Sequence, residues 1–362
     1  MLRPSSASRD VQLADFTTLR LGGPARAFVR ASTDDELIAA VRAADDAGEP
    51  LLILGGGSNL VVSDDGYDGT VVQVATRGIS RDAGPGELTV AAGEDWDAVV
   101  ARTVAEHLAG LECLSGIPGL AGATPIQNVG AYGQEVADTI TAVRVYDRVT
   151  RAVLTKPADQ CGFGYRTSVF KHDQAHRFVV LGVTFRLAAQ TRSMPVRYAE
   201  LAAALGVAPG EQADSTEVRS AVIELRQRKG MVIDPADPDS RSVGSFFVNP
   251  VLDAAALAAV ETAARARYGP EVRVPRFDAG DGLVKVPAAW LIERAGYGKG
   301  YGPSDGPSAG ARISAKHTLA LVNSGSASTA GLIALAREIR DGVSNTFGVS
   351  LTPEPVLIGV AL

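Results

Sequence analysis

The chain has 362 residues, 46% of them hydrophobic and 21% charged, which is enough for two or three globular domains. A net charge of −6 without a basic stripe argues against a nucleic-acid-binding protein, and no apolar run approaches the roughly 20 residues of a membrane span. Two cysteines and four histidines lack metal-ligand spacing, so we expect no metal and a cytoplasmic location. The polar segment 1–10 has no signal-peptide core.

The N-terminal part of the chain alternates strand and helix. Phe28-Val29 is typical of a short strand, and a helix is predicted over Asp34–Ala47 with Thr33 and Glu36 as its capping box. A buried strand, Leu51–Leu54, follows. This order favours a sheet with at least one crossover helix.

A glycine cluster, Gly55-Gly56-Gly57-Ser58-Asn59, follows that strand and leads into a second one, Leu60–Val62. No Gly-Lys-Ser/Thr comes after it, which excludes a P-loop, and a strand instead of a helix follows, which excludes a Rossmann turn. Two interpretations remain. The backbone amides form an anion-binding turn, or the cluster is a glycine-rich hairpin without a ligand.

The rest of the chain mixes strands and helices as in an α+β protein. The polar, alanine-rich stretch 202–216 is interpreted as a connection to a separate C-terminal domain. Strands are expected at Thr70–Val74, Leu88–Ala91, Ala142–Tyr146, Arg177–Leu187, Val243–Val248 and Leu319–Val322, and helices at Trp96–His107 (stopped by Gly110), Thr216–Arg228, Asp253–Ala266 and Ser328–Asp341.

A second glycine-rich segment, 114–133, has too many glycines and prolines for a core and too few charges for a linker. Its glycines leave backbone amides unshielded, and Pro118 and Pro125 stiffen the path. Uncharged polar residues such as Thr124 and Asn128 add donors. Two loops of this kind predict a cradle for a large cofactor.

Three polar residues stand in unusual surroundings. Arg166 lies among aromatic residues and glycine, as in oriented guanidinium groups that bind carboxylate or phosphate, although a surface arginine stacked on Tyr165 is the alternative. Ser245 precedes two phenylalanines without the spacing of a nucleophile elbow, and an ordinary strand start is its alternative. Glu354 stands between two prolines that restrict its direction, and an exposed turn acid is its alternative.

Taken together, these motifs resemble the UDP-N-acetylenolpyruvoylglucosamine reductase family, over nearly the whole chain. The resemblance rests on five motifs in the family's order: Gly55-Gly56-Gly57-Ser58-Asn59, Ile117-Pro118-Gly119 through Gly133, Tyr165-Arg166-x-Ser168, Gly244-Ser245-Phe246-Phe247-x-Asn249-Pro250, and Pro353-Glu354-Pro355. It implies an α+β fold with two FAD-binding subdomains of the vanillyl-alcohol-oxidase-like type and a C-terminal α+β substrate domain. The expected boundaries are 12–75 and 76–205 for FAD binding, 206–350 for the substrate domain and 351–362 for a strand carrying Glu354.

The resemblance also implies the reaction. NADPH would reduce non-covalent FAD, and flavin N5 would then deliver a hydride to UDP-N-acetylglucosamine enolpyruvate, giving UDP-N-acetylmuramate for peptidoglycan synthesis. By motif match Ser245 donates the proton, while Arg166 and Glu354 stabilise the enol form. The residue types suit these roles, because a carbanion-like centre takes a proton even from a serine hydroxyl, whereas an ordinary carboxyl group is already ionised at neutral pH.

Binding residues are carried over in the same way. Tyr198 matches the tyrosine that closes over the substrate in the family's longer subtype, and Lys229, Asn249 and Glu293 are also assigned to the substrate. Lys229 and Asn249 are the candidates for compensating the Ser245 alkoxide. A monomer without nucleic-acid or membrane partners is expected. The assigned cofactor residues are Gly55, Gly56, Gly57, Ser58, Asn59, Leu60, Ile117, Pro118, Gly119, Ala123, Thr124, Gln127, Asn128, Gly130, Ala131 and Tyr132.

Two rival functions remain at this stage. An FAD-dependent sugar or alcohol oxidase of the same fold would turn over with oxygen and without NADPH. A flavin-free nucleotide-binding or regulatory protein would be colourless when purified.

Overall fold

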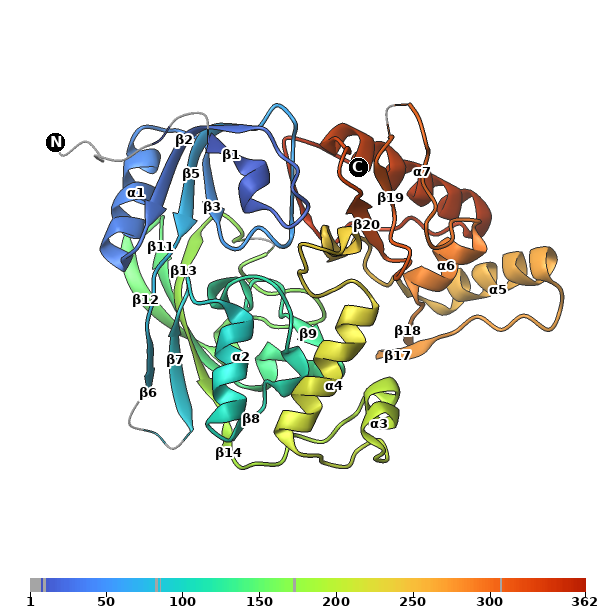
Figure 1. Ribbon diagram of the computed structural model, residues 1–362, viewed down its shortest axis with the longest axis horizontal. Coiled ribbons are helices and arrows are strands. Elements are labelled where there is room, and N and C mark those ends of the chain that lie inside the picture. Colours follow the sequence, from blue (N-terminus) through green and yellow to red (C-terminus); the bar gives the residue numbers. More distant parts are fainter. Residues whose placement is uncertain (1–7, 9–10, 82–83, 85, 172–173, 307) are drawn as a thin grey trace. The chain divides into compact units, whose positions relative to one another are not determined.

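The protein is described by a computed structural model covering residue 8 and residues 11–81, 84, 86–171, 174–306 and 308–362 (Figure 1). The chain divides into two compact units. Unit 1 comprises Met1–Val11, Ala25–Gly57 and Asp68–Arg228, and unit 2 comprises Gln12–Pro24, Ser58–Tyr67 and Lys229–Leu362. Two short segments from the N-terminal part therefore belong to the C-terminal unit.

A four-stranded sheet opens the fold, with the strand order β1-β2-β5-β3. Strands β3 and β5 are parallel, and helix α1 connects β2 to β3, so the expected crossover helix is confirmed. The elements are β1 (Val11–Gln12), β2 (Pro24–Ala31), α1 (Asp34–Asp46), β3 (Leu51–Leu54) and β5 (Tyr67–Val74).

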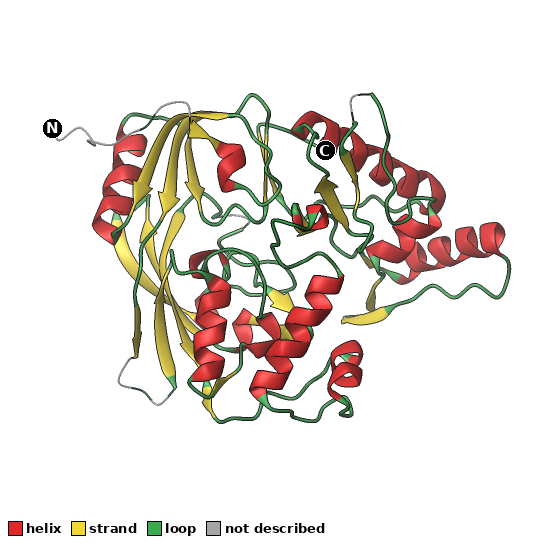
Figure 2. Ribbon diagram, viewed as in Figure 1, coloured by secondary structure: helices red, strands yellow, loops and turns green. Residues whose placement is uncertain are grey.

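A five-stranded antiparallel sheet and helix α2 form the second layer of unit 1 (Figure 2). Its core includes apolar residues of the strands together with Trp96, whose ring lies 5.8 Å from that of Phe185. In β13 (Phe178–Arg186) the residues from 179 to 183 are all buried, so this central strand is covered on both faces of the sheet. In sheet order the strands are β12 (Ala152–Pro157), β11 (Ile140–Asp147), β13 (Phe178–Arg186), β7 (Glu87–Ala91) and β6 (Ile79–Arg81), and α2 spans Trp96–Ala105.

The remaining part of unit 1 is built from short pairs and two helices. Helices α3 and α4 pack on each other through a separate apolar cluster that includes Val196, Leu201, Val218 and Val222. The elements are β8 (Leu108–Ala109) with β14 (Ala188–Ala189), β9 (Gly130–Ala131) with β10 (Gln134–Glu135), α3 (Ala199–Leu205) and α4 (Ser215–Arg228).

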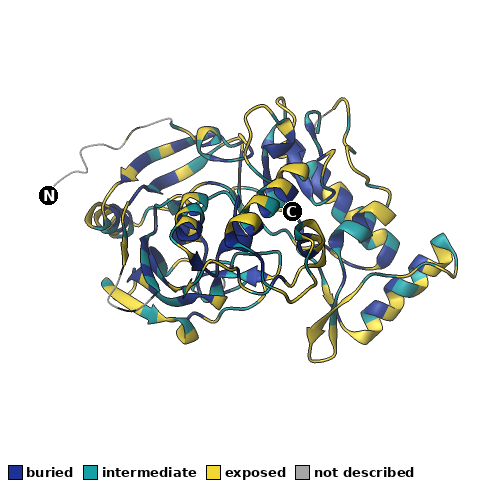
Figure 3. Ribbon diagram, turned by 60° about the horizontal axis from the view of Figure 1, so that its bottom comes forward, coloured by how far each residue is buried: buried dark blue, intermediate teal, exposed yellow. Residues whose placement is uncertain are grey.

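Unit 2 has its own core, which contains the apolar face of α7 (Thr329–Phe347). Figure 3 shows buried and exposed residues alternating along the helices. The described residues of unit 2 form three small sheets. The first is β15 (Ser242–Ser245), β20 (Ala320–Asn323) and β19 (Ala311–Ile313), the second is β16 (Val251–Leu252), β18 (Leu283–Lys285) and β17 (Phe277–Gly280), and the third is the parallel pair β21 (Val356–Ile358) with β4 (Leu60–Val62). Its helices are α5 (Ala254–Tyr268), α6 (Ala288–Arg294) and α7 (Thr329–Phe347).

Several helix ends differ from the expected ones. The side chain of Thr33 caps α1 as predicted. The carboxylate of Glu36, however, accepts from the amide of Ser32 (2.7 Å) and not from that of Thr33, so the capping box is incomplete. Helix α2 ends at Ala105, because His107 adopts a left-handed φ of 56° before Gly110 is reached.

The boundary between units also lies elsewhere than expected. The sequence places a connection at 202–216 and a boundary after 205, whereas this stretch contains parts of α3 and α4, and unit 1 runs to Arg228. The apolar face of α4, with Val218, Val222 and Leu225, is buried in the cluster shared with α3, so α4 remains with unit 1.

Among the described residues, no helix is both long and apolar enough to cross a bilayer. The expectation that segment 1–10 is not a signal peptide falls outside the described residues, apart from Ser8.

Candidate functional site

The two glycine loops predicted to form the cofactor cradle meet within unit 1. A Cβ atom placed on Gly56 would lie 2.8 Å from the Cα of Gly119, so the loop backbones touch where no side chain fits. Among the described residues, none accepts a hydrogen bond from the amides of Gly55, Gly56, Gly57 or Gly119. Amides in a glycine-only cradle suit the pyrophosphate of a dinucleotide such as FAD.

The hairpin interpretation of the first cluster is wrong. Strand β3, before the cluster, pairs with β5, whereas β4, after it, pairs with β21. The two strands flanking the glycines thus belong to different sheets, and a tight turn between paired strands does not explain the glycines. Gly55, Gly56 and Gly57 lie in unit 1, while Ser58, Asn59 and Leu60 lie in unit 2.

The N-terminus of α2 fastens the beginning of the second loop. The indole N–H of Trp96 donates to the carbonyl of Leu114 (3.2 Å), and the backbone amide of Trp96 donates to the carbonyl of Gly119 (3.0 Å). Asp97 Oδ1 accepts from the amide of Gly116 (2.6 Å). Burial opposes ionisation of Asp97, but hydrogen bonds from Arg219 and Gly116 outweigh it and lower the pKa of this carboxyl.

Polar side chains in the second loop bond mainly to their own surroundings. Asn128 is 1% exposed; its amide donates to Glu135 Oε2 (3.0 Å) and to the carbonyl of Gly164 (3.1 Å), and its oxygen accepts from the amide of Ala137 (3.1 Å). Thr124 donates to the carbonyl of Ala121 (2.8 Å). These side chains, which the sequence predicts as donors to a ligand, instead hold the loop in shape.

Arg166 is docked on the same loop. Its Nη2 donates to the carbonyl of Gly130 (2.9 Å), and its guanidinium lies over the ring of Tyr165, 5.5 Å from the centroid. Lys171 holds the segment, donating to the carbonyl of Arg166 (3.2 Å) and to Gln127 Oε1 (3.5 Å). The stacking on Tyr165 expected of a surface arginine is present, and the hydrogen bond to Gly130 also fixes the guanidinium on the second loop.

Tyr198, the residue matched to the substrate-closing tyrosine, packs against the end of the second loop. Its ring meets that of Tyr132 edge to face, with centroids 5.4 Å apart, while Tyr198 itself is 46% exposed. Burial raises the pKa of the Tyr132 hydroxyl to about 12, partly offset by the nearby charge of Arg226. Tyr198 thus packs one edge of its ring on Tyr132 and leaves the rest of its side chain partly exposed.

In unit 2, Ser245 and Glu354 are brought together by backbone pairing. The amide of Glu354 donates to the carbonyl of Phe246 (2.9 Å), and an isolated bridge joins Phe247 to Pro353. Both phenylalanines are buried, with ring centroids 5.1 Å apart. The buried rings fix the strand, and the residues beside them, Ser245 and Glu354, stay partly exposed. Neither an ordinary strand start nor a loose turn acid describes this arrangement.

The end of the first glycine cluster joins the Glu354 segment. The amide of Val356 donates to the carbonyl of Asn59 (2.9 Å), and Asn59 Nδ2 contacts the carbonyl of Glu354 (3.5 Å). From there Leu60 pairs with Val356 as β4 and β21 begin. A residue assigned to the cofactor thus supports the backbone of a residue assigned to catalysis.

The other residues assigned to the substrate have different settings. Asn249 Oδ1 accepts from the amide of Ala288 (2.9 Å), at the first turn of α6. Glu293, exposed near the end of α6, accepts from the hydroxyl of Thr318 (2.5 Å). Lys229 directly follows α4. Asn249 acts as a helix-capping acceptor here, a role that sequence reasoning missed because its partner lies 39 residues away.

A buried carboxylate near the second loop was also missed. Glu112 is fully buried and accepts from the amides of Gly110 (2.6 Å) and Met194 (2.6 Å) and from Gln134 Nε2 (3.1 Å). It therefore ties the start of the loop to its end and to the segment before Tyr198. The signal in the sequence was a lone charge beside Cys113 in an otherwise uncharged stretch.

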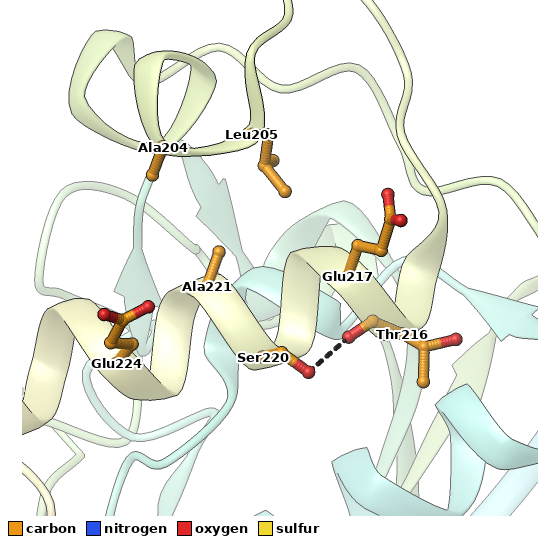
Figure 4. Close-up of a pocket in the computed structure, with 7 residues that line it drawn as sticks. All are labelled: Ala204, Leu205, Thr216, Glu217, Ser220, Ala221 and Glu224. Carbon is orange, nitrogen blue, oxygen red and sulfur yellow. Dashed lines mark hydrogen bonds between the residues drawn. The ribbon is translucent and has the colours of Figure 1, made fainter.

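A surface groove of ≈ 470 Å³ lies between α3 and α4 (Figure 4). None of the predicted site residues lines it. Its lining residues are Ala204, Leu205, Thr216, Glu217, Ser220, Ala221 and Glu224. The described part of the chain holds no group of three histidine, cysteine or acidic residues placed to bind a metal ion.

Comparison with known proteins agrees with this division of the chain. Residues 25–153 match the family described as FAD binding domain, and residues 235–358 match the UDP-N-acetylenolpyruvoylglucosamine reductase C-terminal domain. The reductase of that name from Saccharopolyspora erythraea is 59% identical over 97% of this chain and 95% of its own, and that from Mycolicibacterium smegmatis is 53% identical over 97% and 95%. The crystal structure of UDP-N-acetylenolpyruvylglucosamine reductase from Thermus caldophilus matches with a TM-score of 0.63 and 25% identity, covering 98% of this chain and 99% of its own.

Proposed function

The chain belongs to the UDP-N-acetylenolpyruvoylglucosamine reductase family, and on this basis we propose that it reduces UDP-N-acetylglucosamine enolpyruvate to UDP-N-acetylmuramate with FAD and NADPH. Bound FAD would supply the hydride-transfer chemistry between NADPH and the enolpyruvyl double bond. The product serves peptidoglycan synthesis, and we place the enzyme in the cytoplasm as a monomer. The proposal rests on the 59% and 53% identity to two reductases of this name, each over 97% of the chain.

The cofactor contacts follow from the glycine cradle. We assign the FAD pyrophosphate to the backbone amides of Gly55, Gly56, Gly57 and Gly119, because no described group accepts a hydrogen bond from them and the two loops approach each other at Gly56 and Gly119. The loop 117–132, held by α2 and by its own polar side chains, supports the rest of the cofactor.

The chemical roles are those that the family resemblance assigns to the matching residues. Ser245 donates its hydroxyl proton to the carbon next to the substrate carboxylate. Glu354, whose backbone amide bonds to the residue after Ser245, stabilises the enol form. Arg166, oriented by Gly130, provides the preorganised charge that stabilises the developing enolate. Tyr198, Lys229, Asn249 and Glu293 are assigned to the UDP-sugar.

The test is the absorbance of the purified protein in two anaerobic steps. NADPH should bleach a flavin band near roughly 450 nm, and the enolpyruvyl substrate should then restore it with formation of UDP-N-acetylmuramate. Colourless protein that takes up no FAD would point to a flavin-free nucleotide-binding protein. Reoxidation by oxygen together with reduction by a sugar or alcohol, but not by NADPH, would point to an oxidase and overturn the proposal.

A further inference from the structure

The first glycine of the second loop is tied to α4 through a carboxylate. Asp97 Oδ1 accepts from the Gly116 amide (2.6 Å) and from Arg219 Nη1 (2.7 Å), while Oδ2 accepts from Arg219 Nη2 (2.8 Å). The Arg219 side chain is only 20% exposed. Two parallel hydrogen bonds between Arg219 and Asp97 fix both the orientation of the Asp97 carboxylate and its distance from α4. The position of Gly116 therefore depends on Arg219, which lies more than a hundred residues further along the chain.

The two helices that carry this ion pair pack on each other. Arg219 lies on α4 and Asp97 on the first turn of α2, and α4 lies next to both α2 and α3 within unit 1 (Figure 1).

We propose that Arg219 is a positioning residue that, through Asp97, holds the start of loop 116–132 in the shape that retains FAD. The inference rests on the proposed function, since FAD is its ligand. A loop rich in glycine loses much conformational freedom on ordering, and fixing its first glycine beforehand lowers that cost of binding. Arg219 does not need to touch the cofactor for this effect.

The experiment measures how fast the holoenzyme releases FAD on dilution, followed by the rise in flavin fluorescence. Arg219→Met should release FAD roughly five- to tenfold faster than wild type, the scale of a partly exposed, well-oriented ion pair. Arg219→Lys should recover only part of this, because the fork is lost. The matched control is Arg228→Met on the same helix, whose arginine pairs with Glu224 at the surface and should leave release unchanged.

A second measurement separates positioning from general destabilisation. The double variant Asp97→Asn/Arg219→Met should release FAD no faster than the faster single variant, because both act through one contact. With FAD kept saturating, kcat should stay within about twofold of wild type. Three results would overturn the proposal. They are an unchanged rate of FAD release in Arg219→Met, an equally faster release in Arg228→Met, and additive effects on the release rate in the double variant. Wild-type protein without FAD would instead defeat the proposed function itself.

Discussion

The second glycine loop and the Ser245–Glu354 segment differ in the kind of group that they leave available, backbone in the first and side chains in the second. In the loop, the side chain of Thr124 bonds within the loop, and that of Asn128 bonds to segments beside it, so neither is directed to a ligand. In the segment, the backbone groups are paired, and Ser245 and Glu354 are partly exposed. Under the proposed function, cofactor binding uses the backbone in the first region, and the chemistry uses the side chains in the second.

The largest expected effect tests the side-chain region. Ser245→Ala should slow product formation by roughly 10²- to 10⁴-fold, the usual contribution of a positioned proton donor, while NADPH bleaches the flavin at the wild-type rate. Stopped-flow absorbance measures the two half-reactions separately. Ser220→Ala, at an exposed serine of α4, is the control. Equal loss in both half-reactions would assign Ser245 a structural role.

The next effect tests the backbone region. Gly56→Ala places a Cβ atom 2.8 Å from the Gly119 backbone, so the loops must separate, and FAD affinity should fall roughly 10- to 100-fold. Fluorescence titration of the FAD-free protein gives the dissociation constant. Gly298→Ala is the control, since nothing lies within 4 Å of the added atom there. Unchanged affinity for Gly56→Ala would mean that the cradle does not bind the cofactor.

A smaller effect is expected at Arg166, which is docked on the second glycine loop. Arg166→Lys keeps the charge but loses the guanidinium group that contacts Gly130, so kcat should fall roughly tenfold or more. Steady-state turnover is compared with Arg228→Lys, a surface arginine of α4. Near-normal turnover in Arg166→Lys would show that charge alone suffices.

The smallest effect distinguishes two roles for Asn249. If it acts only as the cap of α6, Asn249→Ala should lower the free energy of unfolding by about 1 kcal/mol without raising the KM for the substrate. A raised KM with unchanged stability would support the substrate contact implied by the family resemblance. Thermal melts and steady-state kinetics are run beside Asn345→Ala, at an exposed position of α7.

The sequence by itself determined the family, the α+β class and the local elements. Capping residues and apolar periodicity are local signals, so α1 and α4 lie within one residue of their expected spans. Glycines and prolines mark a loop that leaves its backbone open, and the order of the motifs is specific to one family. Ser245, Arg166 and Glu354 were each singled out from their immediate neighbours.

Only the tertiary structure decided which groups meet. The bonds of Asp97 with Arg219, of Asn249 with Ala288 and of Phe246 with Glu354 join residues far apart in the sequence. The assignment of α4 to unit 1 was likewise set by burial of its apolar face against α3. Such contacts depend on how whole elements pack, and a local pattern carries no information about the partner that packing will supply.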